Sequence, residues 1–426
     1  LGQPSEPMAN KRRYTDSILF RNGEQVQTEG YCTDVYFDEA LDFIEKLSKA
    51  DEPFFAYIAT NAPHGPYHDV PEKLYQKYKA KDLSPILLGN EKDADRVARV
   101  FAMVENIDEN VGRLMAALDQ LEIDENTLVL FMLDNGPNTR RYVGPMRGMK
   151  TEVHDGGVRS PLFVRWPGRL EAGRSVPQTA APIAEIPTLL DVAGVASPKG
   201  VRFDGRSLMP LMQGQVDAAW SKRTLVLQSH RGTSSLPLHH VMVLRDKWKL
   251  VRPSGFHDHE PAKNTPFELY DISSDPMERK NLASEEPKVL KQLQSAYFNW
   301  HRDVVPKTYV PARIIVGTDH EPITALTRQD WHPISGNSFG NNGQWLLQAK
   351  KAQAYTVTLL LQKPVEKDQP VVLRVCEATY QGVCKAGQSK FRFEKIDAPE
   401  GDFDLQASIG EDEASRGPWQ IIWSRN

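Results

Sequence analysis

Residues 128–136 read Leu-Val-Leu-Phe-Met-Leu-Asp-Asn-Gly, and this stretch decides the class of fold. Six consecutive apolar residues without polar alternation are typical of a strand buried on both faces, as in the centre of an α/β sheet. Ligands of such sheets bind beyond the carboxyl ends of the strands, where Asp134 and Asn135 would lie. A carboxylate next to an amide carbonyl suits calcium or magnesium better than zinc or copper. The alternative interpretation is a β-turn, because Asp-Asn-Gly is also favourable turn sequence.

Two further stretches place polar side chains at predicted strand ends. Residues 53–60 form a second apolar run, which leads through Asn-Ala-Pro to His64. Residues 147–161 mix cations with glycines, include Lys150, and precede a third apolar run at 162–166. A lysine, a histidine and a metal-binding Asp/Asn pair at one sheet edge would suit an anionic ester, because positive charge stabilises an oxyanion group during its transfer.

The order and spacing of these motifs resemble the second half of a formylglycine-dependent sulfatase, an arylsulfatase-like family of the alkaline phosphatase superfamily. The resemblance covers roughly residues 14–304, and several motifs in the right order are more specific than any one of them. It implies that Asp134 and Asn135 bind calcium, with magnesium as the alternative ion, and that Lys150 and His64 bind the sulfate and assist the departing alcohol. The matching segments are 61–64, 134–136, 147–150, 155–159, 166–168, 269–271, 275–276 and 281–283.

The resemblance also shows which parts of the family pattern are not in this chain. That family opens with a strand carrying paired metal-binding aspartates and a Cys-x-Pro-x-Arg motif, whose cysteine becomes the formylglycine nucleophile. The three cysteines, Cys32, Cys376 and Cys384, do not stand in such a motif. We therefore expect the chain to be the C-terminal portion of a longer sulfatase, inactive as given, with formylglycine supplied by the missing segment. The sheet would then expose an open edge or face and favour aggregation.

The pattern of elements predicts an α/β fold with three parts. Residues 1–220 alternate strands and helices, which indicates a mostly parallel, alkaline-phosphatase-like sheet flanked by helices, including helices at about 34–47 and 93–121. Residues 221–304 read as a small α+β C-terminal subdomain with three short strands and a helix at about 287–302. Residues 305–426 show short strands separated by turns, which predicts an appended β-sandwich.

Composition restricts the partners. A formal net charge of −4 and a pI near 6.3 give no electrostatic reason for binding nucleic acid. No apolar run is long enough for a membrane span. The resemblance to sulfatases implies a sulfated small molecule or glycan as the partner, and the periplasm or the cell exterior as the location. Cys376 and Cys384 have seven residues between them at a predicted hairpin, where a disulfide and two buried thiols are equally compatible with the spacing.

Alternatives remain open at the level of function and of single residues. A phosphodiesterase or phosphonate hydrolase of the same superfamily would share this half, and a non-catalytic protein could bind sulfated glycans through its sandwich. The Asp-Asn pair favours one metal and sulfate. We expect His154 to pack rather than catalyse, and Arg147 and Arg159 to bond backbone carbonyls. The sandwich aromatics are expected in the core, with sugar stacking as the alternative. They are Trp331, Trp345, Tyr355, Tyr380, Trp419 and Trp423.

Overall fold

The computed structural model describes nearly the whole chain. The described residues are 14–22, 24–215, 220, 222–230, 234–258, 264–307, 310–334, 342–411 and 415–425. Contacts divide the chain into two compact units: one comprises residues 31–231 and 235–307, and the other residues 1–30, 232–234 and 308–426. No helix of the described residues is long and apolar enough to cross a membrane.

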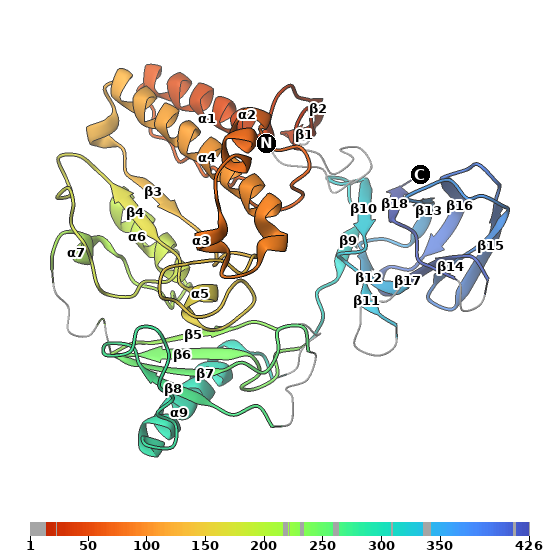
Figure 1. Ribbon diagram of the computed structural model, residues 1–426. Coiled ribbons are helices and arrows are strands. Elements are labelled where there is room, and N and C mark those ends of the chain that lie inside the picture. Colours follow the sequence, from red (N-terminus) through yellow and green to blue (C-terminus); the bar gives the residue numbers. More distant parts are fainter. Residues whose placement is uncertain are drawn as a thin grey trace. The chain divides into compact units, whose positions relative to one another are not determined.

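Two long helices lie side by side in the first unit (Figure 1). They are α1 (Cys32–Lys49) and α4 (Ala94–Gln120), close to the two helices predicted from the apolar periodicity. The Asp34 carboxylate of α1 accepts hydrogen bonds from the side-chain amides of Asn106 and Asn110, at 2.7 and 2.6 Å. This polar link fixes the two helices in register. The remaining helices before residue 220 are α2 (Glu72–Lys79), α3 (Ser84–Leu87), η1 (Glu91–Asp93), η2 (Asp124–Asn126), α5 (Asp155–Val158), η3 (Pro182–Ala184), α6 (Glu185–Ala193) and α7 (Met209–Met212).

The apolar run that ends at Asp134 forms strand β3 (Val129–Met132), which pairs with β4 (Leu162–Arg165). The pairing is antiparallel, with Met132 opposite Leu162, so these two strands do not follow the predicted parallel arrangement. The chain between them, residues 133–161, holds only the short helix α5 and returns to the end of the pair at which β3 finishes. All residues of β3 are half-buried, not buried on both faces.

Residues 53–60, predicted as a strand, show no regular secondary structure. Their side chains alternate between half-buried and exposed, and Phe55 and Tyr57 are 67% and 80% exposed. A strand exists only through hydrogen bonds to a neighbour. No strand of the described residues pairs with this segment.

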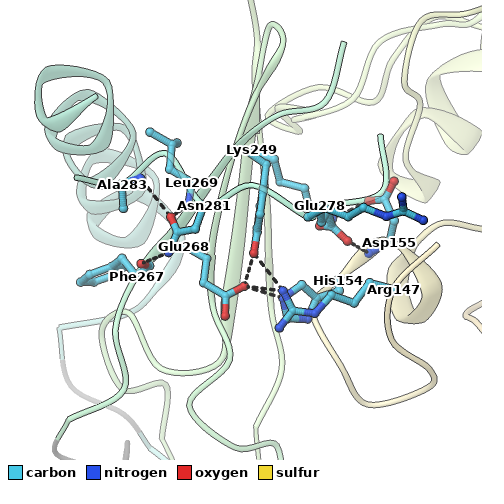
Figure 2. Close-up of polar contacts among 12 residues, drawn as sticks. Arg147, His154, Asp155, Lys249, Phe267, Glu268, Leu269, Glu278, Asn281 and Ala283 are labelled. Atoms are coloured by element: carbon cyan, nitrogen blue, oxygen red, sulfur yellow. Dashed lines mark hydrogen bonds and ion pairs between the residues drawn. The ribbon is translucent and has the colours of Figure 1, made fainter. Parts of the chain in front are cut away.

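A four-stranded antiparallel sheet with one helix follows; it contains the three predicted strands and the predicted helix, and its first strand is a fourth one that was not predicted. The strand order is β5 (Thr224–Gln228), β6 (Val241–Arg245), β7 (Trp248–Arg252) and β8 (Glu268–Asp271). Helix α9 (Pro287–Val304) packs Leu293 and Tyr297 on the apolar face of this sheet. The Asn281 side chain receives the backbone N–H groups of Leu269 and Ala283, so the Asn-Leu-Ala motif holds β8 in place (Figure 2).

The second unit contains the predicted β-sandwich. One sheet has the order β10-β18-β13-β16, and the other β11-β12-β17-β14-β15 with β9 parallel to β12. Trp331, Trp345, Tyr355 and Trp423 are at most 4% exposed in its core, as expected. The strands are β9 (Ile314–Val316), β10 (Ile323–Thr327), β11 (His332–Pro333), β12 (Gly343–Ala349), β13 (Gln353–Leu360), β14 (Gln369–Val375), β15 (Ala378–Cys384), β16 (Lys390–Ala398), β17 (Gly401–Ile409) and β18 (Gln420–Arg425), and the hairpin β1 (Ile18–Arg21) with β2 (Glu24–Gln27) belongs to the same unit.

The two sandwich cysteines are free thiols. Cys376 lies in the turn between β14 and β15, whereas Cys384 ends β15 opposite Gln369, at the far end of the hairpin. A strand rises about 3.4 Å per residue, so this register separates the thiols by far more than a disulfide spans. The disulfide left open by the spacing is thereby excluded.

Candidate functional site

The structure brings Lys150 next to the Asp134-Asn135 turn. The backbone N–H of Lys150 donates to the carbonyl of Pro137 at 2.8 Å, and the N–H of Gly136 donates to the carbonyl of Gly157 at 2.9 Å. Two backbone hydrogen bonds therefore join the turn after β3 to residues 147–158, which we call the lysine loop. The loop lies beside the turn because β4 runs antiparallel to β3 and the connecting chain stays at one end of the pair.

Glycines make this close approach of two backbones possible. A Cβ atom at Gly136 would lie 1.8 Å from the carbonyl oxygen of Gly156, and one at Gly156 would lie 2.3 Å from the carbonyl oxygen of Gly148. Side chains cannot occupy these positions, so the Asp-Asn-Gly and Asp-Gly-Gly motifs are needed together. The chain bends at Asp134 and Asn135, and the site role of these two residues stays a prediction.

Asp134 and Asn135 supply oxygen atoms that fit part of a calcium site. Asp134 is exposed and Asn135 half-buried, and the Asn135 amide donates to the Asp134 carboxylate at 2.9 Å and to the Gly136 carbonyl at 3.2 Å. Calcium takes 6–8 oxygen ligands. The described residues contain no group of three or more His, Cys, Asp or Glu side chains that could hold a metal. The pair fits a calcium ion only with further ligands.

His64 lies in a loop after residues 53–60, between the cis peptides Ala62-Pro63 and Gly65-Pro66. Its imidazole is exposed, and its ring Nδ1 bonds the Gly65 carbonyl at 2.8 Å. Its backbone N–H donates to the Asn61 carbonyl, and the Asn61 side chain accepts from the Tyr36 hydroxyl. These contacts are local, so the substrate role of His64 stays a prediction.

Arg147 and His154 attach the lysine loop to strand β8 (Figure 2). The Glu268 carboxylate accepts from Arg147 at 3.0 Å, from His154 Nε2 at 2.8 Å and from the Tyr270 hydroxyl at 2.5 Å. Burial alone would raise the pKa of the Glu268 carboxyl, but the hydrogen bonds from His154 and Tyr270 outweigh it and hold that pKa at about 2. The carboxylate is therefore charged at neutral pH.

These contacts correct one prediction and agree with another. Arg147 bonds a carboxylate and the Tyr270 hydroxyl, not backbone carbonyls. It does so because β8 places Glu268 within reach, which no local pattern reveals. His154 is 2% exposed and hydrogen-bonded, in line with the expected packing role. Arg159 pairs with the Asp155 carboxylate at 3.7 Å rather than with a carbonyl, because it lies four residues further along the chain.

The sequence did not reveal two other attachments of the lysine loop. The ring of His240 donates from Nε2 to the carbonyl of Thr151 at 2.7 Å, and its Nδ1 accepts the N–H of Gly255 at 3.1 Å. A carbonyl only accepts, so this pair of bonds fixes the tautomer of His240. Burial lowers the pKa of His240, which favours this neutral form. Lys249, on β7, forms ion pairs with Asp155 and Glu278.

Comparison with known proteins identifies the family. A sulfatase family model matches residues 4–195, and the model described as N-sulphoglucosamine sulphohydrolase, C-terminal, matches residues 149–301. The N-acetylgalactosamine-6-sulfatase of Canis lupus familiaris is 35% identical over 192 residues, which are 44% of this chain and 33% of that protein. The uncharacterized sulfatase YdeN of Escherichia coli K12 is 27% identical over 307 residues, 66% of this chain and 52% of that protein.

A solved structure shows the same fold. The crystal structure of Ps i-CgsB in complex with k-i-k-neocarrahexaose has a TM-score of 0.58 and 22% identity, and the similarity covers 70% of this chain and 60% of that one. The chain spans about half or less of the length of the two curated relatives. Over residues 4–301 the chain belongs to the sulfatase family.

Proposed function

We propose that the protein hydrolyses sulfate esters of a carbohydrate. Family membership supports the reaction class, and the N-acetylgalactosamine-6-sulfatase relative supports a sugar substrate. The observation that supports the proposal is the hydrogen bond from the backbone N–H of Lys150 to the carbonyl of Pro137, because it brings this residue close to Asp134 and Asn135. An ammonium group and a metal cation that lie close together suit the negatively charged sulfate group of a sulfate ester better than a neutral ester.

Each residue has a distinct task in this proposal. Asp134 and Asn135 would hold calcium, which when bound offsets charge on the sulfate oxygens. The Lys150 ammonium binds the sulfate group and compensates negative charge on its oxygens. His64, in its exposed loop, holds a proton for the oxygen of the departing alcohol. The nucleophile is formylglycine in the family resembled, and its Cys-x-Pro-x-Arg motif is not among residues 1–426, so this chain by itself is expected to be inactive.

The test uses the full-length product of the gene and 6-sulfated N-acetylgalactosamine as the first probe. We expect Lys150→Ala to lower kcat/KM by about 100-fold or more, the usual effect of losing one group that stabilises an oxyanion. Lys49→Ala is the matched control, because Lys49 pairs with Glu45 on the surface of α1 and its side chain is 68% exposed. Equal activity of both variants would refute the site assignment.

Metal dependence and the choice of probe separate the rival functions. Chelation of the metal should abolish hydrolysis by the full-length protein, and added calcium should restore it. Residues 1–426 alone should bind calcium weakly, because one carboxylate and one amide leave most of the coordination shell to water. Submicromolar affinity in a calorimetric titration would contradict that expectation. Faster hydrolysis of a phosphate diester than of the sulfate ester would favour a phosphodiesterase. Tight glycan binding without turnover would favour a non-catalytic binding protein.

A further inference from the structure

Lys249 is a buried lysine. Its side chain is 1% exposed, and its ammonium contacts the carboxylates of Asp155 and Glu278, the latter at 2.7 Å. The Glu278 side chain is fully buried and that of Asp155 is 14% exposed. Burying a charge costs free energy unless oppositely charged groups surround it. The three side chains therefore form one unit, which we call the buried triad.

The buried triad joins two segments that are distant in sequence. Lys249 lies on β7 and Glu278 follows β8, whereas Asp155 belongs to the lysine loop (Figure 2). Asp155 is attached twice, because its backbone N–H also donates to the Glu278 carboxylate at 2.9 Å. Both attachments hold the same residue of the loop, so they fix its position and its orientation relative to the sheet.

Asp155 is only five residues from Lys150, and the chain between them has little freedom. Val153 is 1% exposed and packs with Val251 and Tyr270 of the sheet. Thr151 has a φ of 75° and its carbonyl accepts from His240. A segment held at both ends and in the middle transmits a displacement of Asp155 to Lys150, because few rotations are left to absorb it.

We infer that Lys249 is a positioning residue for Lys150. Through Asp155, the buried triad holds the lysine loop in the conformation in which the backbone of Lys150 bonds Pro137, close to Asp134 and Asn135. The inference rests on the proposed function, in which the Lys150 ammonium binds the sulfate group. It assigns to the C-terminal subdomain a part in sulfate recognition that Lys249 exerts without touching the substrate.

The experiment compares Lys249→Met and Lys247→Met in the full-length protein. Lys247 is the matched control, because it lies two residues earlier and pairs with Asp271 at 2.6 Å, but its side chain is 46% exposed. The measurements are the inhibition constant of inorganic sulfate, taken well below the unfolding temperature, and hydrogen–deuterium exchange of the lysine loop and of α9. A general loss of stability would speed hydrogen–deuterium exchange in α9 as well as in the lysine loop, and it would leave the inhibition constant of sulfate unchanged.

For Lys249→Met we expect the inhibition constant of sulfate to rise about 10-fold to 100-fold, the usual effect of misplacing a binding group through its support. Exchange should increase in the lysine loop and stay unchanged in α9, and Lys247→Met should match the wild type in every measurement. A Lys249→Met protein with wild-type sulfate affinity and wild-type loop exchange would overturn the inference.

A second variant covers the case in which Lys249→Met does not fold. Asp155→Asn removes only the charge on the loop side and leaves Lys249 and Glu278 as a balanced pair within the sheet region. Weakened sulfate affinity with faster loop exchange supports the inference, and unchanged values overturn it. Lys150→Ala separates the two proposals. If this variant binds sulfate as tightly as the wild type does, the proposed function fails. If it loses sulfate affinity while Lys249→Met and Asp155→Asn keep theirs, only the positioning role fails.

Discussion

At the scale of single residues, Glu268 shows how partners outweigh burial. Its carboxylate receives three hydrogen bonds and its pKa falls from 4.5 to about 2. A carboxyl whose pKa is depressed in the folded state contributes stability above its unfolded pKa, and this contribution disappears as the pH falls through the folded value. The relevant window therefore runs from about pH 4.5 down to about pH 2.

We predict that Glu268→Gln lowers the free energy of unfolding at pH 7 by about 3 to 4 kcal/mol, since the pKa falls from 4.5 to about 2 and each pKa unit corresponds to about 1.4 kcal/mol. The difference between wild type and variant should shrink as the pH falls from about 4.5 to about 2. Urea unfolding of both proteins across this range measures it. A difference that is independent of pH would show that the charge of Glu268 is not responsible.

Sequence patterns pointed to some residues and not to others. Asp134, Asn135 and Lys150 stand in local motifs, so their residue types and spacing pointed to a site. Lys249 stands in Trp-Lys-Leu-Val-Arg, which does not distinguish a buried lysine from an exposed one. Its partner Asp155 is 94 residues away, and only the folded chain brings them together. Residues that support a site through such distant contacts leave no local signal.

At the scale of elements, periodicity predicted helices better than strands. Helices α1 and α4 follow the apolar repeat along their own sequence, because a helix satisfies its hydrogen bonds internally. Residues 53–60 have strand-like composition but no regular structure, because strand formation depends on a neighbour. For the same reason the antiparallel pairing of β3 with β4 could not be read from their apolar runs.

The contact between the Asp134 turn and the lysine loop gives a second prediction. Gly136→Ala should destabilise the protein by about 1 to 3 kcal/mol, the usual cost of overpacking, because its Cβ would meet the Gly156 carbonyl oxygen at 1.8 Å. Gly112→Ala is the control: Gly112 lies within α4 with open space around its Cβ position, and alanine there should stabilise by about 0.5 to 1 kcal/mol. Thermal unfolding of both variants tests this. Two variants of equal stability would contradict the close backbone approach.

At the scale of the whole molecule, the two units have separate cores. Every buried residue of the sandwich core lies between Val316 and Trp423. The buried residues of the core between this sheet and α9 lie between Val241 and Tyr297, and the partly buried ones between Val226 and Trp300. Among the described residues, neither of these two cores contains a side chain from the other's stretch of sequence. The predicted periplasmic or extracellular location stays a prediction.

We therefore predict that residues 310–426 produced alone fold cooperatively. A single thermal transition with loss of near-ultraviolet circular dichroism would agree with an independent core. The thiol of Cys376, which is exposed, should react with iodoacetamide in this native fragment, whereas the buried Cys384 should react only after unfolding. A non-cooperative transition, or equal reactivity of both thiols, would contradict the prediction.

The attachments of the lysine loop also bear on recombination between homologous enzymes. Consider a hybrid whose crossover lies near residue 220, between the α/β region and the C-terminal subdomain. It would inherit Arg147, His154 and Asp155 from one parent. Their partners Glu268, Lys249 and Glu278 would come from the other parent. Hybrids made at that point should keep their cores, but under the proposed function they should lose hydrolysis of the sulfate ester unless the loop and strands β7 and β8 are exchanged as one block.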